Sequence, residues 1–181
     1  MPRIEYRPDD DLGPPSLVAA IRSRRGGALL KMDRVMLHSP VFAAAWNDFL
    51  RVVIGDLSLP ERESQFVMCI VGILNGADYE VFSHAPRFLS AGGTEEQLQA
   101  LEDIDAAIRN EAVFTLRERA ILKMTVEMTQ SIAVDEHCFE QARHVLKDEK
   151  EMVDLIGLIA TYNMVSRFVV ALDIRADDGS L

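Results

Sequence analysis

The chain has 181 residues, of which 49% are apolar, and a net charge of −10. A chain of this length buries roughly 70% of the surface that its unfolded form exposes, so it needs neither a disulfide nor a metal ion to fold. Because an acidic surface repels phosphate groups and anionic lipids, we expect neither nucleic acid nor a membrane as a partner.

Two further features predict a cytoplasmic protein. Cys69 and Cys138 lie far apart and form no CxxC motif, as expected of free thiols in a reducing compartment. The N-terminus has no apolar leader segment, and the longest clean apolar segment, residues 67–74, is too short to span a bilayer.

The spacing of apolar residues is helical along most of the chain, and strand signals are almost absent. We therefore predict an all-α fold, with an N-terminal arm over residues 1–13, one helical domain over 14–172 and a polar tail over 173–181. The predicted helices cover about 15–25, 28–37, 40–55, 58–75, 77–90, 94–104, 115–130, 135–146 and 149–172. Capping boxes that start at Ser58, Thr94 and Thr115 mark three of these helix starts.

The candidate chemistry lies in the helix over 77–90. Glu80 and His84 are four residues apart, so both project from one face of that helix. A carboxylate in this position orients an imidazole, and an imidazole exchanges protons near neutral pH. A plain surface ion pair or a hydrogen-bonded core histidine would show the same spacing. In the preceding helix, Gln65 and Gly72 share a face whose small residues permit close approach, and we expect His84 to face a sheltered hollow between these helices.

An offset of 57 residues aligns the chain with itself and suggests two pseudo-symmetric helical units, although apolar helices also match by chance. In this alignment Glu80 falls on His137 and His84 falls on Gln141. Only the first unit then carries the Glu/His pair, which predicts one site per chain.

The last predicted helix carries a polar stripe of Asn163, Ser166 and Arg167 between apolar flanks. A mostly buried arginine needs an anionic partner, because an unpaired buried charge is costly. The partner is either a structural carboxylate or the carboxylate of a substrate. A metal site needs three or four converging ligands, and Glu80 with His84 supplies two, so we predict no metal.

The segment from Leu59-Pro60 through Tyr79-Glu80-Val81-Phe82-Ser83-His84, together with residues 159–168, resembles the carboxymuconolactone decarboxylase family of the alkylhydroperoxidase D-like superfamily. The resemblance implies an all-helical bundle that assembles into trimers or hexamers. Peroxidase members carry CxxC where this chain has Ala77 and Glu80, whereas decarboxylase-like members keep the glutamate and histidine found here. Two positions depart from the family pattern: its usual glutamate is Gln65 and its usual tryptophan is Val81.

The leading hypothesis is decarboxylation, without a cofactor, of a small carboxylated lactone or enol acid by a homo-oligomer, whether dimer, trimer or hexamer. His84 and Glu80 would be catalytic, and Tyr79, Gln65 and Arg167 would bind the substrate. The alternatives are an alkylhydroperoxidase-like peroxidase or antioxidant protein, and a non-catalytic oligomeric binding protein.

Overall fold

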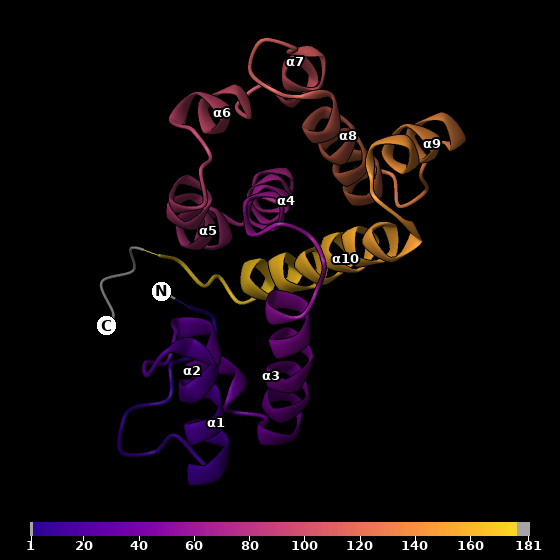
Figure 1. The fold of residues 1–181 in the computed structure, drawn as a ribbon. Coiled ribbons are helices and arrows are strands. Elements are labelled where there is room, and N and C mark those ends of the chain that lie inside the picture. The colour runs from indigo at the N-terminus through magenta and orange to yellow at the C-terminus, as the bar shows by residue number, and fades with distance from the viewer. Residues whose placement is uncertain (1, 177–181) are drawn as a thin grey trace. The chain divides into compact units, whose positions relative to one another are not determined.

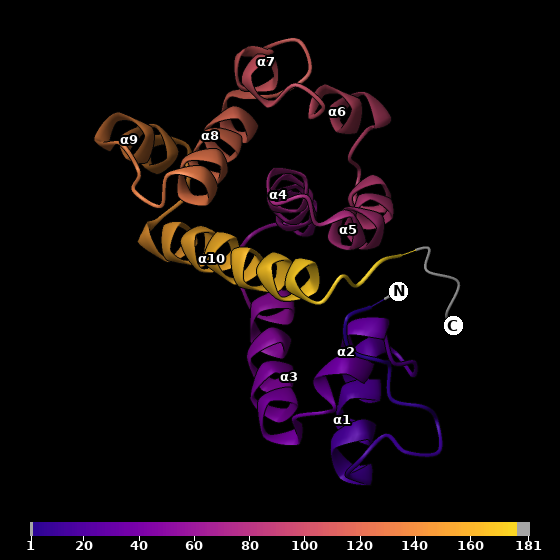
Figure 2. The same cartoon turned by 180° about the vertical axis from the view of Figure 1, so that it is seen from behind.

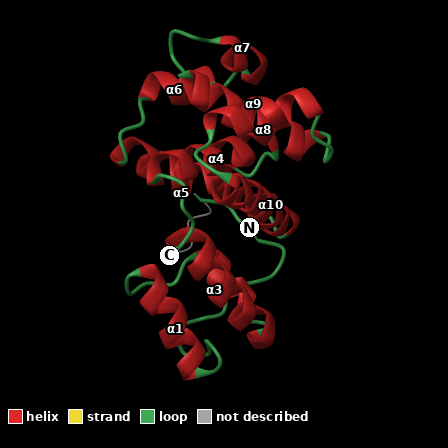
Figure 3. Cartoon of the chain, turned by 45° about the vertical axis from the view of Figure 1, so that its right-hand side comes forward, coloured by secondary structure: helices red, strands yellow, loops and turns green. Residues whose placement is uncertain are grey.

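The computed structural model describes residues 2–176, which form ten helices and no strand (Figure 3). The predicted all-α fold is therefore confirmed. The described residues divide into two compact units, one built from residues 2–57 together with residues 171–176, and the other from Ser58–Val170. The expected division into an arm, one domain and a tail stays a prediction, and residues 177–181 of the tail lie outside the described residues.

The first unit contains three helices, α1 (Pro15–Arg25), α2 (Lys31–Met36) and α3 (Pro40–Gly55). Its polar anchor is Asp33, which is fully buried. Arg25 donates to both carboxylate oxygens of Asp33 at 2.9 and 3.1 Å, and the backbone N–H of Leu30 donates to Oδ2 at 2.9 Å. One carboxylate therefore joins the end of α1 to the start of α2.

The second unit is built around α4, which lies between α5 and α8 in opposite views (Figures 1 and 2). Its helices are α4 (Glu61–Leu74), α5 (Asp78–Ser90), α6 (Glu95–Ala100), α7 (Ile104–Arg109), α8 (Leu116–Gln130), α9 (Glu136–Val145) and most of α10 (Glu149–Ala171). Phe66 of α4 packs against the rings of Phe88 and Phe114, with 5.5 Å between centroids in each pair. The apolar inner surface of α4 thus holds α5 and the segment before α8 in place.

Within residues 2–176, α10 is the one helix long and apolar enough to span a membrane by length and composition alone. A core helix passes the same test, and half of its most apolar window is buried. Leu155, Leu158 and Ile159 in this helix are fully buried. This burial is typical of a core helix, and the absence of a membrane partner stays a prediction.

Two of the three predicted capping boxes form, and the third does not. The boxes at Thr94 and Thr115 form as expected, with each threonine oxygen accepting a hydrogen bond from the backbone N–H three residues later. The box at Ser58 is wrong, because α4 has Pro60 as its N-cap, without a side-chain cap. Ser58 instead donates from its backbone N–H and its hydroxyl to Asp154, a residue distant in sequence. The short helix α7, capped by Asp103, was not predicted.

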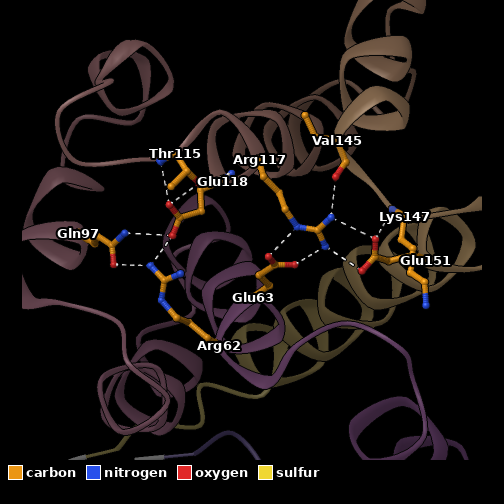
Figure 4. A network of polar contacts seen from close by, with 9 residues as sticks. All are labelled: Arg62, Glu63, Gln97, Thr115, Arg117, Glu118, Val145, Lys147 and Glu151. Carbon is orange, nitrogen blue, oxygen red and sulfur yellow. Dashed lines mark hydrogen bonds and ion pairs between the residues drawn. The ribbon is translucent and has the colours of Figure 1, made fainter.

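Two arginine-centred networks connect the first turns of α4 and α8 (Figure 4). Arg62 of α4 pairs with Glu118 of α8, and Arg117 of α8 donates to both oxygens of Glu63 of α4 at 2.7 Å. Arg117 also reaches Glu151 in α10 at 2.8 Å. Each helix therefore gives one arginine and one glutamate to the other, which fixes their relative rotation about the core of this unit.

Candidate functional site

The site starts at the tight junction between α4 and α5. Gly76 has φ +61°, a left-handed conformation that glycine adopts without strain, and it lets the chain reverse between the helices. A side chain on Gly72 would place its Cβ 3.3 Å from the Cβ of Glu80 and 3.0 Å from Val81. The close approach predicted for these helices is therefore confirmed, and it brings Glu80 against α4.

His84 is buried on the inner face of α5 and is held from three directions. Its Nδ1 lies 2.7 Å from Oε1 of Gln65, and its Nε2 lies 3.4 Å from Oε2 of Glu80. The ring of Tyr162 in α10 packs edge-on against the imidazole, with 5.1 Å between centroids. The predicted Glu80–His84 pair thus forms inside the protein, where the side chains are 3% and 6% exposed, rather than on its surface.

These contacts determine where the imidazole carries its protons. Because the amide oxygen of Gln65 only accepts, Nδ1 of His84 carries hydrogen and donates to it. Nε2 then faces Oε2 of Glu80 at 3.4 Å, an ion-pair distance. Gln65 thus fixes the tautomer and leaves Nε2 directed toward Glu80.

Two buried side-chain oxygens, one of them in this pair, have no hydrogen-bond partner in the described part of the chain. They are Oε1 of Glu80 and Oγ of Ser166, in residues that are 2% and 0% exposed. Buried polar atoms are normally hydrogen-bonded, so both oxygens are exceptions with unused acceptor capacity. Tyr79, the residue before Glu80, is also buried at 6% exposure and makes a polar or ring contact of its own.

The expectation of a mostly buried Arg167 is wrong. Asn163 and Ser166 are buried, but Arg167 is exposed, and its Nη1 donates to the backbone oxygen and Oδ1 of Asn163 at 2.9 Å. Arg167 has apolar neighbours in sequence, but the helical register of α10 places its side chain on the exposed side of the helix. The guanidinium therefore needs no buried anionic partner.

Sequence reasoning gave Tyr162 no role, although it packs directly on His84. The available signal was an aromatic residue within an apolar helix, one position before the polar stripe. That signal is weak, because it does not say which face of α10 meets α5.

Both thiols are poor nucleophiles in this structure. Cys69 on α4 has no exposed surface, and burial raises its pKa to about 12. Burial, followed by the nearby charge of Glu127, raises the pKa of Cys138 to about 12. At neutral pH such thiols hold very little thiolate, which is the reactive form.

The cavity described in this unit does not adjoin the Glu/His pair. It lies between α8 and α9, with a volume of about 520 Å³, and its lining includes none of Gln65, Glu80 and His84. A hollow beside His84 therefore stays a prediction. Among the described residues no group of three or more His, Cys, Asp or Glu side chains is placed to hold a metal ion.

Comparison with known proteins identifies a family over part of the chain. Residues 40–127, which carry α4, α5 and the Gln65–Glu80–His84 cluster, match the model of the carboxymuconolactone decarboxylase family. Comparison with curated proteins found no match.

Solved structures place this chain within the alkylhydroperoxidase D-like fold. A variant of the debrominase Bmp8 in complex with 2,3,4-tribromopyrrole is 17% identical, with a TM-score of 0.79 over 96% of this chain and 90% of that chain. An uncharacterized peroxidase-related protein from Silicibacter sp. TM1040 is 16% identical, with a TM-score of 0.77 over 98% of this chain and 95% of that chain. An uncharacterized peroxidase-related protein from Ralstonia eutropha JMP134, described as an alkylhydroperoxidase AhpD core, is 18% identical, with a TM-score of 0.75 over 98% of this chain and 93% of that chain. At these identities the likeness establishes the fold alone.

Proposed function

We propose that the protein catalyses decarboxylation of a small carboxylated lactone or enol acid by proton transfer, without a cofactor. The observation that carries this proposal is the buried Glu80–His84 pair, with Nδ1 of His84 held by Gln65 at 2.7 Å and Nε2 facing Glu80 at 3.4 Å. The match of residues 40–127 to the carboxymuconolactone decarboxylase family supports the same reaction class.

The proposed reaction needs one proton and no redox partner. The bond between the substrate carbon and its carboxylate breaks, CO₂ leaves, and the electron pair passes into the conjugated carbonyl as a dienolate. Nε2 of His84 then delivers its proton to the carbon that lost CO₂. Glu80 shares that proton before transfer, and water restores it afterwards, so each turnover consumes one solvent proton and releases one CO₂.

The remaining residues would position the substrate. Oε1 of Glu80 is a buried acceptor for a substrate hydroxyl or enol. Arg167 would bind the substrate carboxylate through its planar guanidinium, with Asn163 anchoring Nη1. Tyr79 would line the same site as a hydrogen-bonding group next to Glu80. Assembly into a homo-oligomer and a cytoplasmic location are part of the proposal.

The test is turnover of a panel of carboxylated lactones and enol acids, followed by CO₂ release. His84→Ala and Glu80→Gln should each lower the rate by about 10²-fold or more, as is typical for loss of a general acid. His38→Ala is the matched control, since His38 is exposed and contacts only the backbone oxygen of Glu5 among the described residues. Undiminished turnover in a folded His84→Ala protein would reject the proposal.

A thiol peroxidase is the second candidate, because the fold is shared with peroxidase-related proteins. The raised pKa of Cys69 and the lack of CxxC weigh against it. An assay with cumene hydroperoxide and a dithiol reductant separates the two. Turnover that depends on dithiol and disappears in Cys69→Ser would favour the peroxidase and not the decarboxylase.

A further inference from the structure

The cavity between α8 and α9 is separate from the proposed catalytic pair. It has a volume of about 520 Å³, within the range of small-molecule sites in proteins. α7 contributes one lining residue, Ile108, and α8 and α9 contribute the rest. Because all three helices belong to the unit formed by Ser58–Val170, the cavity is defined within one compact part of the chain.

The lining carries two permanent cations and one carboxylate in a protein that is acidic overall. Arg119 and Lys123 of α8 lie along one wall, and His137 and His144 of α9 lie along the other. The one acidic lining residue is Glu140, which lies 3.6 Å from Arg143 on its own helix. Positive groups concentrated here, in a chain of net charge −10, favour an anionic ligand.

The two permanent cations retain binding capacity. Lys123 donates to the neutral amide oxygen of Gln141 at 3.1 Å, and no carboxylate in residues 2–176 lies within ion-pair distance of it. Arg119 pairs through Nη1 with Glu111, which is 76% exposed, so water weakens that pair. Nε of Arg119 is buried and has no hydrogen-bond partner in the same part of the chain. Both side chains can therefore turn donors toward an anion.

The rest of the lining is apolar and suits a hydrocarbon body. Ile108, Leu116, Ala120 and Val145 line the same cavity, and Leu116 leaves 60% of its surface exposed. An apolar side chain this exposed, beside cationic groups, matches a ligand with one charged end and one apolar end. Such sites combine apolar walls with a few polar groups that set the orientation.

The repeat gives this cavity a counterpart in the first half of the chain. The offset of 57 places His137 and Gln141, both lining residues, on Glu80 and His84. The helices that carry these pairs are each packed on the helix before them, α5 on α4 and α9 on α8. The second half thus has a binding cavity where the first half has the acid–base pair.

We propose that the cavity between α8 and α9 binds a small monocarboxylate with an aromatic or branched aliphatic body. Lys123 and Arg119 hold the carboxylate, and the apolar residues of α7, α8 and α9 enclose the body. Glu140 and His144 line the cavity at the four-residue spacing of Glu80 and His84, but the carboxylate of Glu140 pairs with Arg143 at 3.6 Å. The proposed site therefore binds its ligand without converting it.

The test is a titration of ¹⁵N-labelled protein with benzoate, cyclohexanecarboxylate and 4-methylpentanoate, each matched with its neutral amide. At least one acid should give saturable shifts confined to α7, α8 and α9, and its amide should bind about tenfold more weakly or worse, because a charged hydrogen bond is lost. Lys123→Gln should weaken binding by about tenfold, and Ala120→Leu should block it by filling the cavity. Arg51→Gln removes a positive charge from α3, where Arg51 is exposed and pairs with Asp56 rather than with a lining residue, and should leave the affinity unchanged, as should His84→Ala.

Three results would overturn the proposal. The first is no saturable shift in these helices with any of the three acids. The second is equal binding of acid and amide. The third is an equal loss of affinity in Arg51→Gln and Lys123→Gln, which would show a diffuse charge effect.

Discussion

Replacing Arg117 with methionine should lower the free energy of unfolding by about 2–3 kcal/mol. Its guanidinium donates to both oxygens of Glu63 at 2.7 Å, to Glu151 at 2.8 and 3.2 Å, and to the backbone oxygen of Val145 at 2.7 Å. Methionine retains most of the packing volume but leaves two carboxylates facing each other without a cation. Removing one partner of a buried ion pair costs about 3–5 kcal/mol, and an exposed pair contributes at most about 1 kcal/mol. The three side chains are 26%, 12% and 9% exposed, which places this network nearer the buried limit.

Urea denaturation followed by circular dichroism measures this loss, and thermal unfolding should show a decrease of about 5–10 °C for a chain of this size. Arg143→Met is the matched control, because Arg143 pairs with Glu149 at 2.7 Å but both side chains are more than half exposed. That variant should lose far less stability than Arg117→Met, because water screens an exposed pair. Equal losses in the two variants would refute the reasoning from burial.

The carboxylates provide an independent check. Glu63→Gln and Glu151→Gln together, in the Arg117→Met background, should recover part of the lost stability, since they remove the repulsion between like charges. Burial alone raises the pKa of Glu151, but the hydrogen bond from Arg117 and the N–H of Lys147 together lower it below the ordinary 4.5. The stabilisation is therefore present above pH 4.5 and disappears as the pH falls through the lowered pKa. The difference between wild type and Arg117→Met should shrink over the same pH range.

Two further predictions concern α4, α5 and α10. Gly72→Ala should destabilise the protein by up to about 2 kcal/mol and shift the amide signal of Glu80, because overpacking against α5 exceeds the roughly 1 kcal/mol gain in helix propensity. Gly157→Ala is the control and should stabilise the protein, because its added Cβ meets nothing within 4 Å. A gain in stability in both variants would contradict the close packing of α4 on α5. Asp154→Asn should lower the urea midpoint at neutral pH and have little effect near pH 2. Burial alone raises the pKa of Asp154, but hydrogen bonds from Lys150 and Ser58 lower it from 3.8 to about 2. The stabilisation from Asp154 is therefore present above pH 3.8 and disappears as the pH falls through 2. A pH-independent effect of Asp154→Asn would contradict this second assignment.

Local patterns predicted most of the helices and the contact between Glu80 and His84. The four-residue spacing of Glu80 and His84 placed both on one face, and Gly72 indicated close packing of α4 on α5. These predictions succeeded because each depends on residues near one another in sequence. The resemblance to the family added Gln65, which lies 2.7 Å from His84.

Features set by distant residues could not be predicted in this way. Ser58 has the sequence of a helix cap but bonds to Asp154, which only the folded chain brings near. Arg167 has apolar neighbours in sequence but lies on the exposed side of α10. The cavity between α8 and α9 was missed because His137 and His144 gave no motif of their own, although the repeat had aligned His137 with Glu80.

The most direct test of the account is to locate the protons on His84 by ¹⁵N NMR of histidine-labelled protein at neutral pH, with His84→Ala used to assign the signals. The account predicts that Nδ1 is protonated and coupled to Gln65, and that Glu80→Gln changes the signal of Nε2 more than that of Nδ1. An unprotonated Nδ1, or an Nε2 signal that Glu80→Gln leaves unchanged, would contradict it.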